Sequence, residues 1–325
     1  MKRLLCFLLA ACLLLPLLAA CGSSNTTIKV GVLAGTTGMG AVKMIEDADA
    51  RYEITIYPAT TPEALLNDLT AGVVDLAAIP TNAAAKLYNK TNGSIRMLAL
   101  NTLGVLHLVD TTGTVSSLAD LEGKTVYVPM AGQNPEYILR HILAENGINA
   151  TVETSITDAD ALSTALLSSE GENAAVQIAV LPQPKVTVVK NQAAAASIAL
   201  NTLDLSTEWN EIEETTIAQG CLVGRAEFVD NNKRAVKEFL AAYKASIEYV
   251  AAPENLDAAA NLIVANGIIP KAPIAKAALP YCGLAYVDSK TMKDTLTTFY
   301  GILYDFDAKA VGGSLPDENF YFNAD

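Results

Sequence analysis

The glycine-rich segment 35–40, Gly-Thr-Thr-Gly-Met-Gly, is the first stretch whose residue types could bind a ligand. Its outer glycines have the spacing of a phosphate loop, but Ala41-Val42 stands where that loop requires Lys and Ser or Thr. A dinucleotide-binding fingerprint fails too, because Lys43 takes the place of its last glycine. The segment still joins a predicted strand to a predicted helix, where free amides favour anionic or hydrogen-bond-accepting ligands. A simple glycine turn is the alternative interpretation.

Neutral polar side chains follow several other predicted strands at their carboxyl ends, in segments 80–82, 101–104, 132–134 and 182–183. In open α/β sheets ligands bind along this edge. Amide and hydroxyl groups can orient a small molecule without taking part in covalent chemistry. Any one of them could equally be an ordinary helix cap, so the prediction of a binding site depends on their joint placement.

The residue types needed for hydrolytic, redox or metal chemistry are scarce. No Gly-x-Ser-x-Gly occurs, and neither of the two histidines has a Cys or a second His nearby in the sequence. We expect His107 to pack inside a strand and His141 to lie on a solvated helix face, and we interpret the carboxylates at 211–214 as a solvated run. An enzyme is therefore the weaker class, and no cofactor or metal site is expected.

The elements that must position the polar segments alternate between strand and helix. Hydrophobic patterning predicts strands at 28–33, 53–57 and 74–79. One helix is predicted over 39–47, and a second begins with Thr61 as its cap and Pro62 in first position and stops at Gly72. This order is typical of a parallel sheet with helices on both faces.

The alternation continues through the middle of the chain, and helices follow helices from Asp230 onward. Strands are predicted at 97–100, 105–109, 125–129 and 176–181. Helices are predicted from a cap at Asn134 to Gly147 and over 158–169, 254–266 and 289–304, together with an apolar stripe between 236 and 250.

Length and composition restrict the class of protein. The chain has 325 residues, enough for about two domains, and its 51% hydrophobic content excludes a disordered chain. Its net charge is −13, and no cluster of Lys and Arg follows residue 20, so a nucleic-acid partner is not expected.

The N-terminal residues have the pattern of an export signal. Lys2 and Arg3 precede an uncharged run, Leu4 to Ala20, which is marginal for spanning a bilayer of about 30 Å and is typical of a signal peptide. Leu18-Ala19-Ala20-Cys21 resembles the lipobox of bacterial lipoproteins, in which the cysteine becomes the lipidated N-terminus. An ordinary secretory signal is the alternative. Residues 1–20 are thus predicted to be removed, and 21–27 to form a polar tether.

Two cysteines remain after this segment, Cys221 and Cys282. In an exported protein such a pair is a possible disulfide. Two buried free thiols are the alternative, and the sequence leaves the choice open.

Together these motifs resemble bacterial ABC-transporter solute-binding lipoproteins of the nitrate/sulfonate/taurine and thiamine-precursor group. Beside the lipobox, the similarity extends over nearly the whole chain. It is carried by segments 35–39, 74–82, 87–91, 101–106, 121–129, 134–140 and 311–316.

The resemblance implies an α/β, type II periplasmic-binding-protein fold: two lobes, a ligand cleft between them and two hinge crossings. Lobe 1 is expected at 28–104 plus 219–325 and lobe 2 at 105–218. Glu136, if it faced the cleft, would favour an amine-bearing ligand over a plain anion. The cleft residues implied by position are Thr36, Thr37, Gly38, Thr81, Asn82, Asn101, Thr102, Gln133, Asn134 and Gln183.

The function implied is capture of a small organic or oxyanionic solute by lobe closure and its delivery to an ABC permease and that permease's ATPase. The protein is expected to be a monomer, lipid-anchored to the outer face of the bacterial membrane or facing the periplasm. Two alternatives share the fold: the receptor of a tripartite ion-driven transporter, and a lyase or synthase enzyme.

Overall fold

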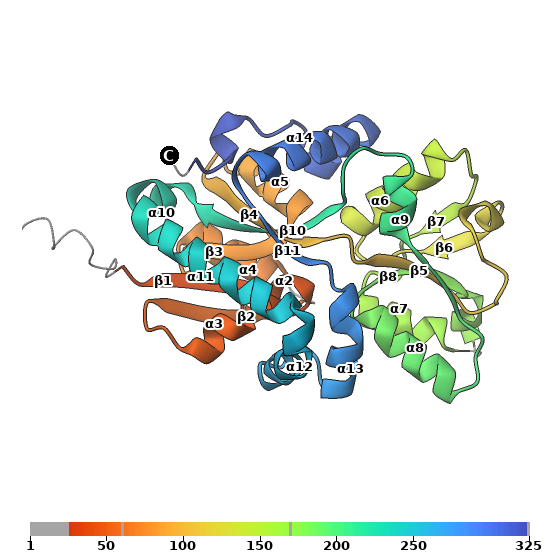
Figure 1. Cartoon of the computed structure of the whole chain (residues 1–325). Helices are drawn as coiled ribbons and strands as arrows, with labels where there is room; N and C mark the ends of the chain where they lie inside the picture. The colour runs from red at the N-terminus through yellow and green to blue at the C-terminus, as the bar shows by residue number, and fades with distance from the viewer. Residues whose placement is uncertain (1–25, 60–61, 169–170, 324–325) are drawn as a thin grey trace, which may run out of the picture.

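The computed structural model describes residues 26–59, 62–168 and 171–323, which form two β-sheets covered by helices (Figure 1). The predicted signal peptide, Cys21 and most of the predicted tether lie outside the described residues, as does Thr61. No helix within the described ranges is long and apolar enough to cross a membrane.

The first sheet has six strands in the order β11-β4-β10-β3-β1-β2. Strands β1 and β2, and β1 and β3, pair in parallel, whereas β10 runs antiparallel to both β3 and β4. The strands predicted at 28–33, 53–57 and 74–79 form the expected parallel part of the sheet. The whole sheet is mixed, because the chain returns to it through β10, which lies between β3 and β4 and runs antiparallel to both. The bounds are β1 Ile28–Leu33, β2 Tyr52–Tyr57, β3 Leu76–Pro80, β4 Ile95–Leu103, β10 Ala218–Arg225 and β11 Leu284–Val287.

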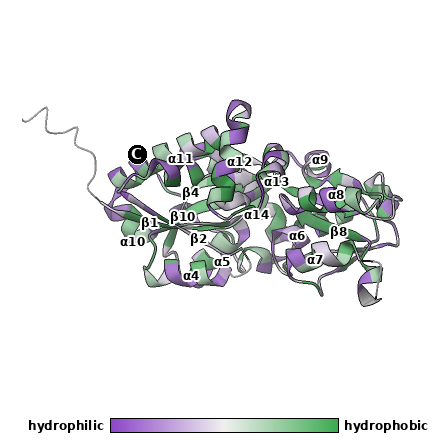
Figure 2. Ribbon diagram, turned by 90° about the horizontal axis from the view of Figure 1, so that it is seen from below, coloured by the Kyte–Doolittle hydropathy of each residue, from purple (hydrophilic) through white to green (hydrophobic). Residues whose placement is uncertain are grey.

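Helices cover both faces of this sheet. On one face α4 (Pro62–Ala71), α5 (Thr81–Lys90) and α14 (Ser289–Phe306) share a core, and on the other α3 (Val42–Asp47), α10 (Ala226–Asn231) and α11 (Lys233–Ala251) share a second. Helices α12 (Leu256–Ala265) and α13 (Ala272–Ala278) form a third core at one end. Figure 2 shows hydrophobic residues along the strands and hydrophilic residues on the outer helices.

The helix predicted over 39–47 is instead two short helices, α2 (Thr36–Met39) and α3. The break falls at Gly40, which packs so closely on α11 that a Cβ there would lie 2.6 Å from Cγ1 of Ile247. This tertiary contact has no local signature in the sequence.

The second sheet has five strands in the order β7-β6-β8-β5-β9. Strand β5 runs antiparallel to β8 and β9, and β6 pairs in parallel with β7 and β8. The bounds are β5 Leu106–Asp110, β6 Thr125–Tyr127, β7 Thr151–Glu153, β8 Ile178–Pro182, β9 Asn201–Asp204, α6 Asn134–Glu145, α7 Ala159–Leu166, α8 Lys185–Ala195 and α9 Leu205–Asn210. Short 3₁₀ turns lie at Leu118–Leu121, Gly171–Ala175, Pro253–Asn255, Leu279–Tyr281, Ala308–Val311 and Glu318–Phe320.

The chain passes between the sheets twice, at 104–105 and at 211–217. One hydrophobic core continues across both sheets on the side of α14, where α14 packs against α6 and Phe299 lies 5.7 Å from Trp209 of α9. On the other side, α13 contacts α8 although their residues belong to separate cores. The two sheets are thus joined more firmly on one side than on the other.

The structure corrects two expectations about single residues. Cys221 and Cys282 are free and buried in different cores, so the possible disulfide is wrong and the free-thiol alternative holds. His141 is buried, not solvated: its Nε2 lies 2.6 Å from Oε1 of Glu213, and its ring packs on Trp209.

Candidate ligand-binding site

The amino ends of α5 and α6 face each other where the two sheets meet. Each helix follows a strand or loop of a different sheet, and each carries two polar residues at its start. Asn134 Nδ2 donates to Thr81 Oγ1 at 3.0 Å, and Asn82 Nδ2 donates to Gln133 Oε1 at 3.0 Å. Two adjacent residues of one helix thus pair with two adjacent residues at the start of the other. The structure brings together these four predicted site residues.

Local sequence explains why the four side chains point this way. Pro80 keeps an extended backbone at the end of β3, so that α5 begins at once with Thr81. Pro135 stands in the first turn of α6, where its missing N–H is tolerated. Asn134 was expected to cap this helix, but the helix contains it and its side chain bonds across to α5.

Lys86 adds a second link between the sheets one turn further along α5. Its Nζ donates to the carbonyl oxygen of Gly132 at 2.5 Å and lies 5.7 Å from the ring centre of Tyr137. Burial lowers the pKa of Lys86, against the opposing effect of the Asp307 and Glu136 carboxylates. Lys86 was not among the predicted site residues, although its spacing from Asn82 places both on the same helix face.

Asn101 and Thr102 form a neighbouring polar group on β4. Asn101 Nδ2 donates to the hydroxyl of Tyr243 at 3.0 Å, and Thr102 Oγ1 donates to Asn101 Oδ1 at 3.0 Å. Burial raises the pKa of Tyr243, which keeps its hydroxyl neutral. Gly220 of β10 fits against this pair, because a Cβ there would lie 2.7 Å from Asn101 Oδ1 and 2.5 Å from Thr37 Cγ2. Thr37 therefore belongs to the same group.

The remaining predicted residues are less closely connected. Thr36 and Gly38 lie in α2, which packs against β1, β3, β4 and β10. Gln183 Oε1 accepts from Thr187 Oγ1 at 2.9 Å, and Gln183 N donates to Val105 O at 2.9 Å. Among the described residues, no hydrogen bond joins Gln183 to the other nine predicted site residues.

Glu136 is occupied by its neighbours. Its Oε2 accepts from the backbone N–H of Gly132 at 2.7 Å, and its Oε1 accepts from Arg140 Nε at 2.8 Å. The carboxylate therefore orders the loop before α6. Because both of its oxygens are bound within the protein, it does not favour an amine-bearing ligand.

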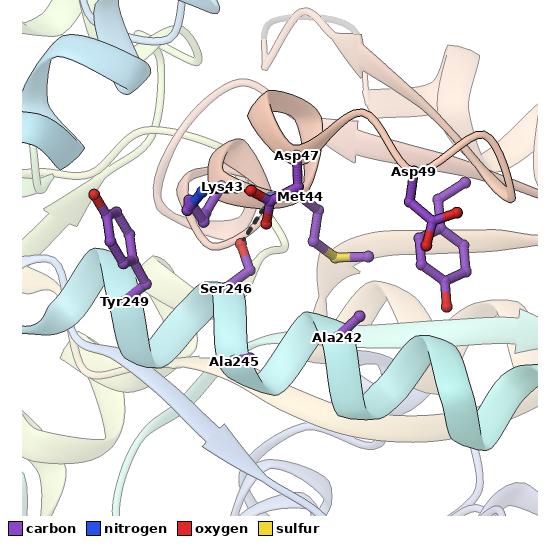
Figure 3. A pocket seen from close by; sticks show the side chains of 9 residues that line it. Lys43, Met44, Asp47, Asp49, Ala242, Ala245, Ser246 and Tyr249 are labelled. Atoms are coloured by element: carbon purple, nitrogen blue, oxygen red, sulfur yellow. Dashed lines mark hydrogen bonds and ion pairs between the residues drawn. The ribbon is translucent and has the colours of Figure 1, made fainter.

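A separate hollow of about 330 Å³ lies between α3 and α11 (Figure 3). It is lined by Lys43, Met44, Asp47, Asp49, Tyr52, Ala242, Ala245, Ser246 and Tyr249. None of the predicted site residues lines it. Within the part of the chain that the structure describes, no three His, Cys, Asp or Glu side chains gather closely enough to hold a metal ion.

Solved structures with the same fold come from several organisms. An ABC transporter from Parabacteroides distasonis is 22% identical, with a TM-score of 0.74 over 92% of this chain and 99% of that one. The periplasmic aliphatic sulphonate binding protein SsuA from Escherichia coli is 15% identical, with a TM-score of 0.71 over 92% and 93%. The zinc-bound ligand binding component of an ABC-type import system from Staphylococcus aureus is 14% identical, with a TM-score of 0.68 over 92% and 97%.

These likenesses confirm the expected fold, two mixed α/β lobes of the periplasmic-binding-protein kind. These neighbours are a transporter protein and two binding proteins rather than enzymes. A comparison with curated protein sequences finds no significant match. Residues 52–255, more than half of the chain, match the NMT1/THI5-like family. The chain belongs to the NMT1/THI5-like family.

Proposed function

We propose that this protein is an extracytoplasmic solute-binding lipoprotein that captures a small solute between its two lobes and delivers it to an ABC permease. The observation that carries the proposal is the pairing of Thr81 and Asn82 with Asn134 and Gln133. Four buried or half-buried polar side chains from two sheets meet there, and none of the four is a general base. Such a group suits recognition of a small molecule.

The comparisons and the sequence support the same class. Two of the structural neighbours are binding proteins, one for aliphatic sulphonates and one that belongs to an ABC-type import system. A sulfonate, nitrate or thiamine-precursor solute is the range that the sequence resemblance implies. The lipobox at Cys21 supports export and a lipid anchor, which would keep the protein near its permease and raise its effective concentration there.

Lobe closure is the proposed mechanism. Lobe 1 would comprise 28–104 plus 219–325 and lobe 2 105–218, with the segments 104–105 and 211–217 as hinges. A ligand that contacts both α5 and α6 binds the closed form more tightly than the open form. It therefore shifts the population toward closure by that difference in affinity.

Thermal melting of the full-length chain in mild detergent tests the proposal, with a panel of alkanesulfonates, nitrate, pyrimidines, amides, amines and aromatic acids. A ligand at 100 times its Kd adds about 2.7 kcal/mol to stability, which raises Tm by a few degrees. Thr81→Val should abolish the shift, since Thr81 Oγ1 bridges Asn134 and the Ala218 carbonyl.

Thr298→Val is the matched control, because Thr298 is exposed on α14. The Thr298→Val protein should show the same ligand-induced rise in Tm as the unchanged protein. Absence of any shift across the panel, with no small molecule retained on native mass spectrometry, would contradict a solute-binding role.

A further inference from the structure

We infer that the ligand presents a neutral N–H donor, of the carboxamide or sulfonamide kind, to the side-chain oxygens of Asn82 and Asn134. This inference rests on the proposed function and names the chemical class of the solute. It starts from three buried oxygens for which the described residues supply no hydrogen-bond partner: Asn82 Oδ1, Asn134 Oδ1 and Gln219 Oε1. All three belong to residues at the junction of α5, α6 and β10.

The orientation of the Asn134 amide follows from its neighbours. Thr81 Oγ1 donates its own proton to the Ala218 carbonyl at 2.5 Å, so toward Asn134 it can only accept. The Gln219 carbonyl, 3.4 Å from Asn134 Nδ2, is also an acceptor. Both contacts require the NH₂ group on this side of the amide. The opposite atom, left without a partner, is therefore the oxygen.

Asn82 carries a second buried amide oxygen, in the other lobe. Its side chain is 0% exposed and that of Asn134 1%, so neither oxygen can be satisfied by bulk solvent. Asn82 Nδ2 donates to Gln133 Oε1, and its Oδ1 has no partner in the part of the chain that the structure describes. A buried acceptor without a donor is costly, and a ligand that supplies the donor removes that cost.

The charges nearby favour a neutral donor over a cation. The Glu136 carboxylate is already bound by Gly132 and Arg140, and Lys86 places an ammonium group beside the same loop. An ammonium ligand would therefore meet a cation without a free carboxylate among these residues. An oxyanion fails for the opposite reason, because its oxygens cannot donate to amide oxygens.

The amino ends of α5 and α6 suit the other half of such a ligand. Neither helix has a side-chain hydrogen bond at its cap, and first-turn amides favour an accepting oxygen. A carboxamide or sulfonamide carries an N–H donor and an acceptor oxygen on one planar or tetrahedral centre. It can thus satisfy the two asparagine oxygens and the helix ends together.

Isothermal titration of the full-length chain in mild detergent tests this with isosteric pairs: propanesulfonamide against propanesulfonate, and benzamide against benzoate. The neutral member of each pair should bind at least about tenfold more tightly than its anion. Tighter binding of the anions would overturn the ligand class while leaving the solute-binding function intact. The proposed ligand class would also be overturned if none of these four compounds bound while a panel compound without an N–H group raised the melting temperature.

Two variants show whether the preference arises at Asn134. Asn134→Leu should reduce the preference for the neutral member at least about fivefold, whereas Asn146→Leu, at the exposed far end of the same helix, should retain it. An unchanged preference in Asn134→Leu, with the fold confirmed by circular dichroism, would contradict the assignment.

Discussion

Gly220 shows how closely the backbone of β10 approaches the candidate site. A Cβ at this position would lie 2.5 Å from Thr37 Cγ2, 2.7 Å from Asn101 Oδ1 and 3.1 Å from Thr102 Cβ. These neighbours belong to α2 and β4, which are both packed in the same lobe, so neither can move aside alone. We expect Gly220→Ala to destabilise the protein by about 1–3 kcal/mol and to weaken ligand binding. Urea denaturation measures the first effect and titration the second.

The same substitution at Gly301 should have the opposite effect on stability. It lies inside α14, and a Cβ there would meet nothing within 4 Å. Gly301→Ala should stabilise the protein by about 0.5–1 kcal/mol, because alanine has less conformational freedom to lose in a helix. Equal effects of the two substitutions would show that the β10 contact is not tight.

His107 should make stability depend on pH. It is buried in β5, and burial lowers its pKa below the ordinary 6.5, with Lys190 acting the same way and Asp204 opposing. Protonation then favours the unfolded chain, which binds more protons than the folded one between the folded pKa and 6.5. Stability is therefore fully present above pH 6.5 and falls as the pH decreases below it, by at most about 1.4 kcal/mol per pH unit.

Denaturation at pH 7.5, 6.5 and 5.5 measures this dependence. In His107→Gln, which cannot titrate in this range, the loss between pH 6.5 and 5.5 should be smaller. The contact between His141 and Glu213 is the same in the unchanged protein and in His107→Gln, so the difference between the two proteins reports on position 107 alone. Identical losses would mean that His107 is not the group responsible.

At the scale of elements, sequence patterning predicted those that depend on local signals. Strand β1 and helix α4 match their predictions because alternation, Pro62 and Gly72 are local features. Strand β10 was not predicted as an element, since its residues Ala218–Arg225 include two glycines whose strand conformation depends on β3 and β4. The break between α2 and α3 likewise depends on a distant helix.

The residues of the candidate site also divide into those with local sequence signals and those that depend on distant contacts. Thr81, Asn82, Gln133 and Asn134 could be predicted because they follow strands or begin helices at the expected sheet edge. Lys86 and Gln219 could not, because their roles depend on partners from other parts of the chain. The burial of His141 was missed for the same reason, since Glu213 is 72 residues away.

Helix α14 should hold the two lobes together through one aromatic contact. Phe299 is fully buried, lies 5.7 Å from the ring of Trp209 and belongs to the core that spans both sheets. Phe299→Ala should cost about 3–5 kcal/mol, because it removes a large buried side chain and leaves a cavity. Thr298→Ala, on the exposed face of the same helix, should change stability by less than about 0.5 kcal/mol. Urea denaturation of both variants measures the difference. A similar small cost for both would show that α14 does not fasten the lobes.

At the scale of the whole molecule, the distribution of the cores predicts the direction of closure. One core runs through α14, α6 and α9, so these elements should move little relative to each other. Helices α13 and α8 touch but belong to separate cores, so their contact can break without opening a hydrophobic interior. We expect the lobes to open on the side of α13 and α8 and to hinge on the side of α14.

Spin-label pairs on exposed positions test this direction by double electron–electron resonance. Labels at Lys190 of α8 and Ala277 of α13 report the opening side, and labels at Ala144 of α6 and Asp305 of α14 report the hinge side. A ligand found in the melting panel should shorten and narrow the distances of the first pair, because it selects the closed form. The second pair should change little, since a shared packed core resists deformation. Equal changes in the two pairs would contradict a hinge at α14, and no change in either would contradict closure itself.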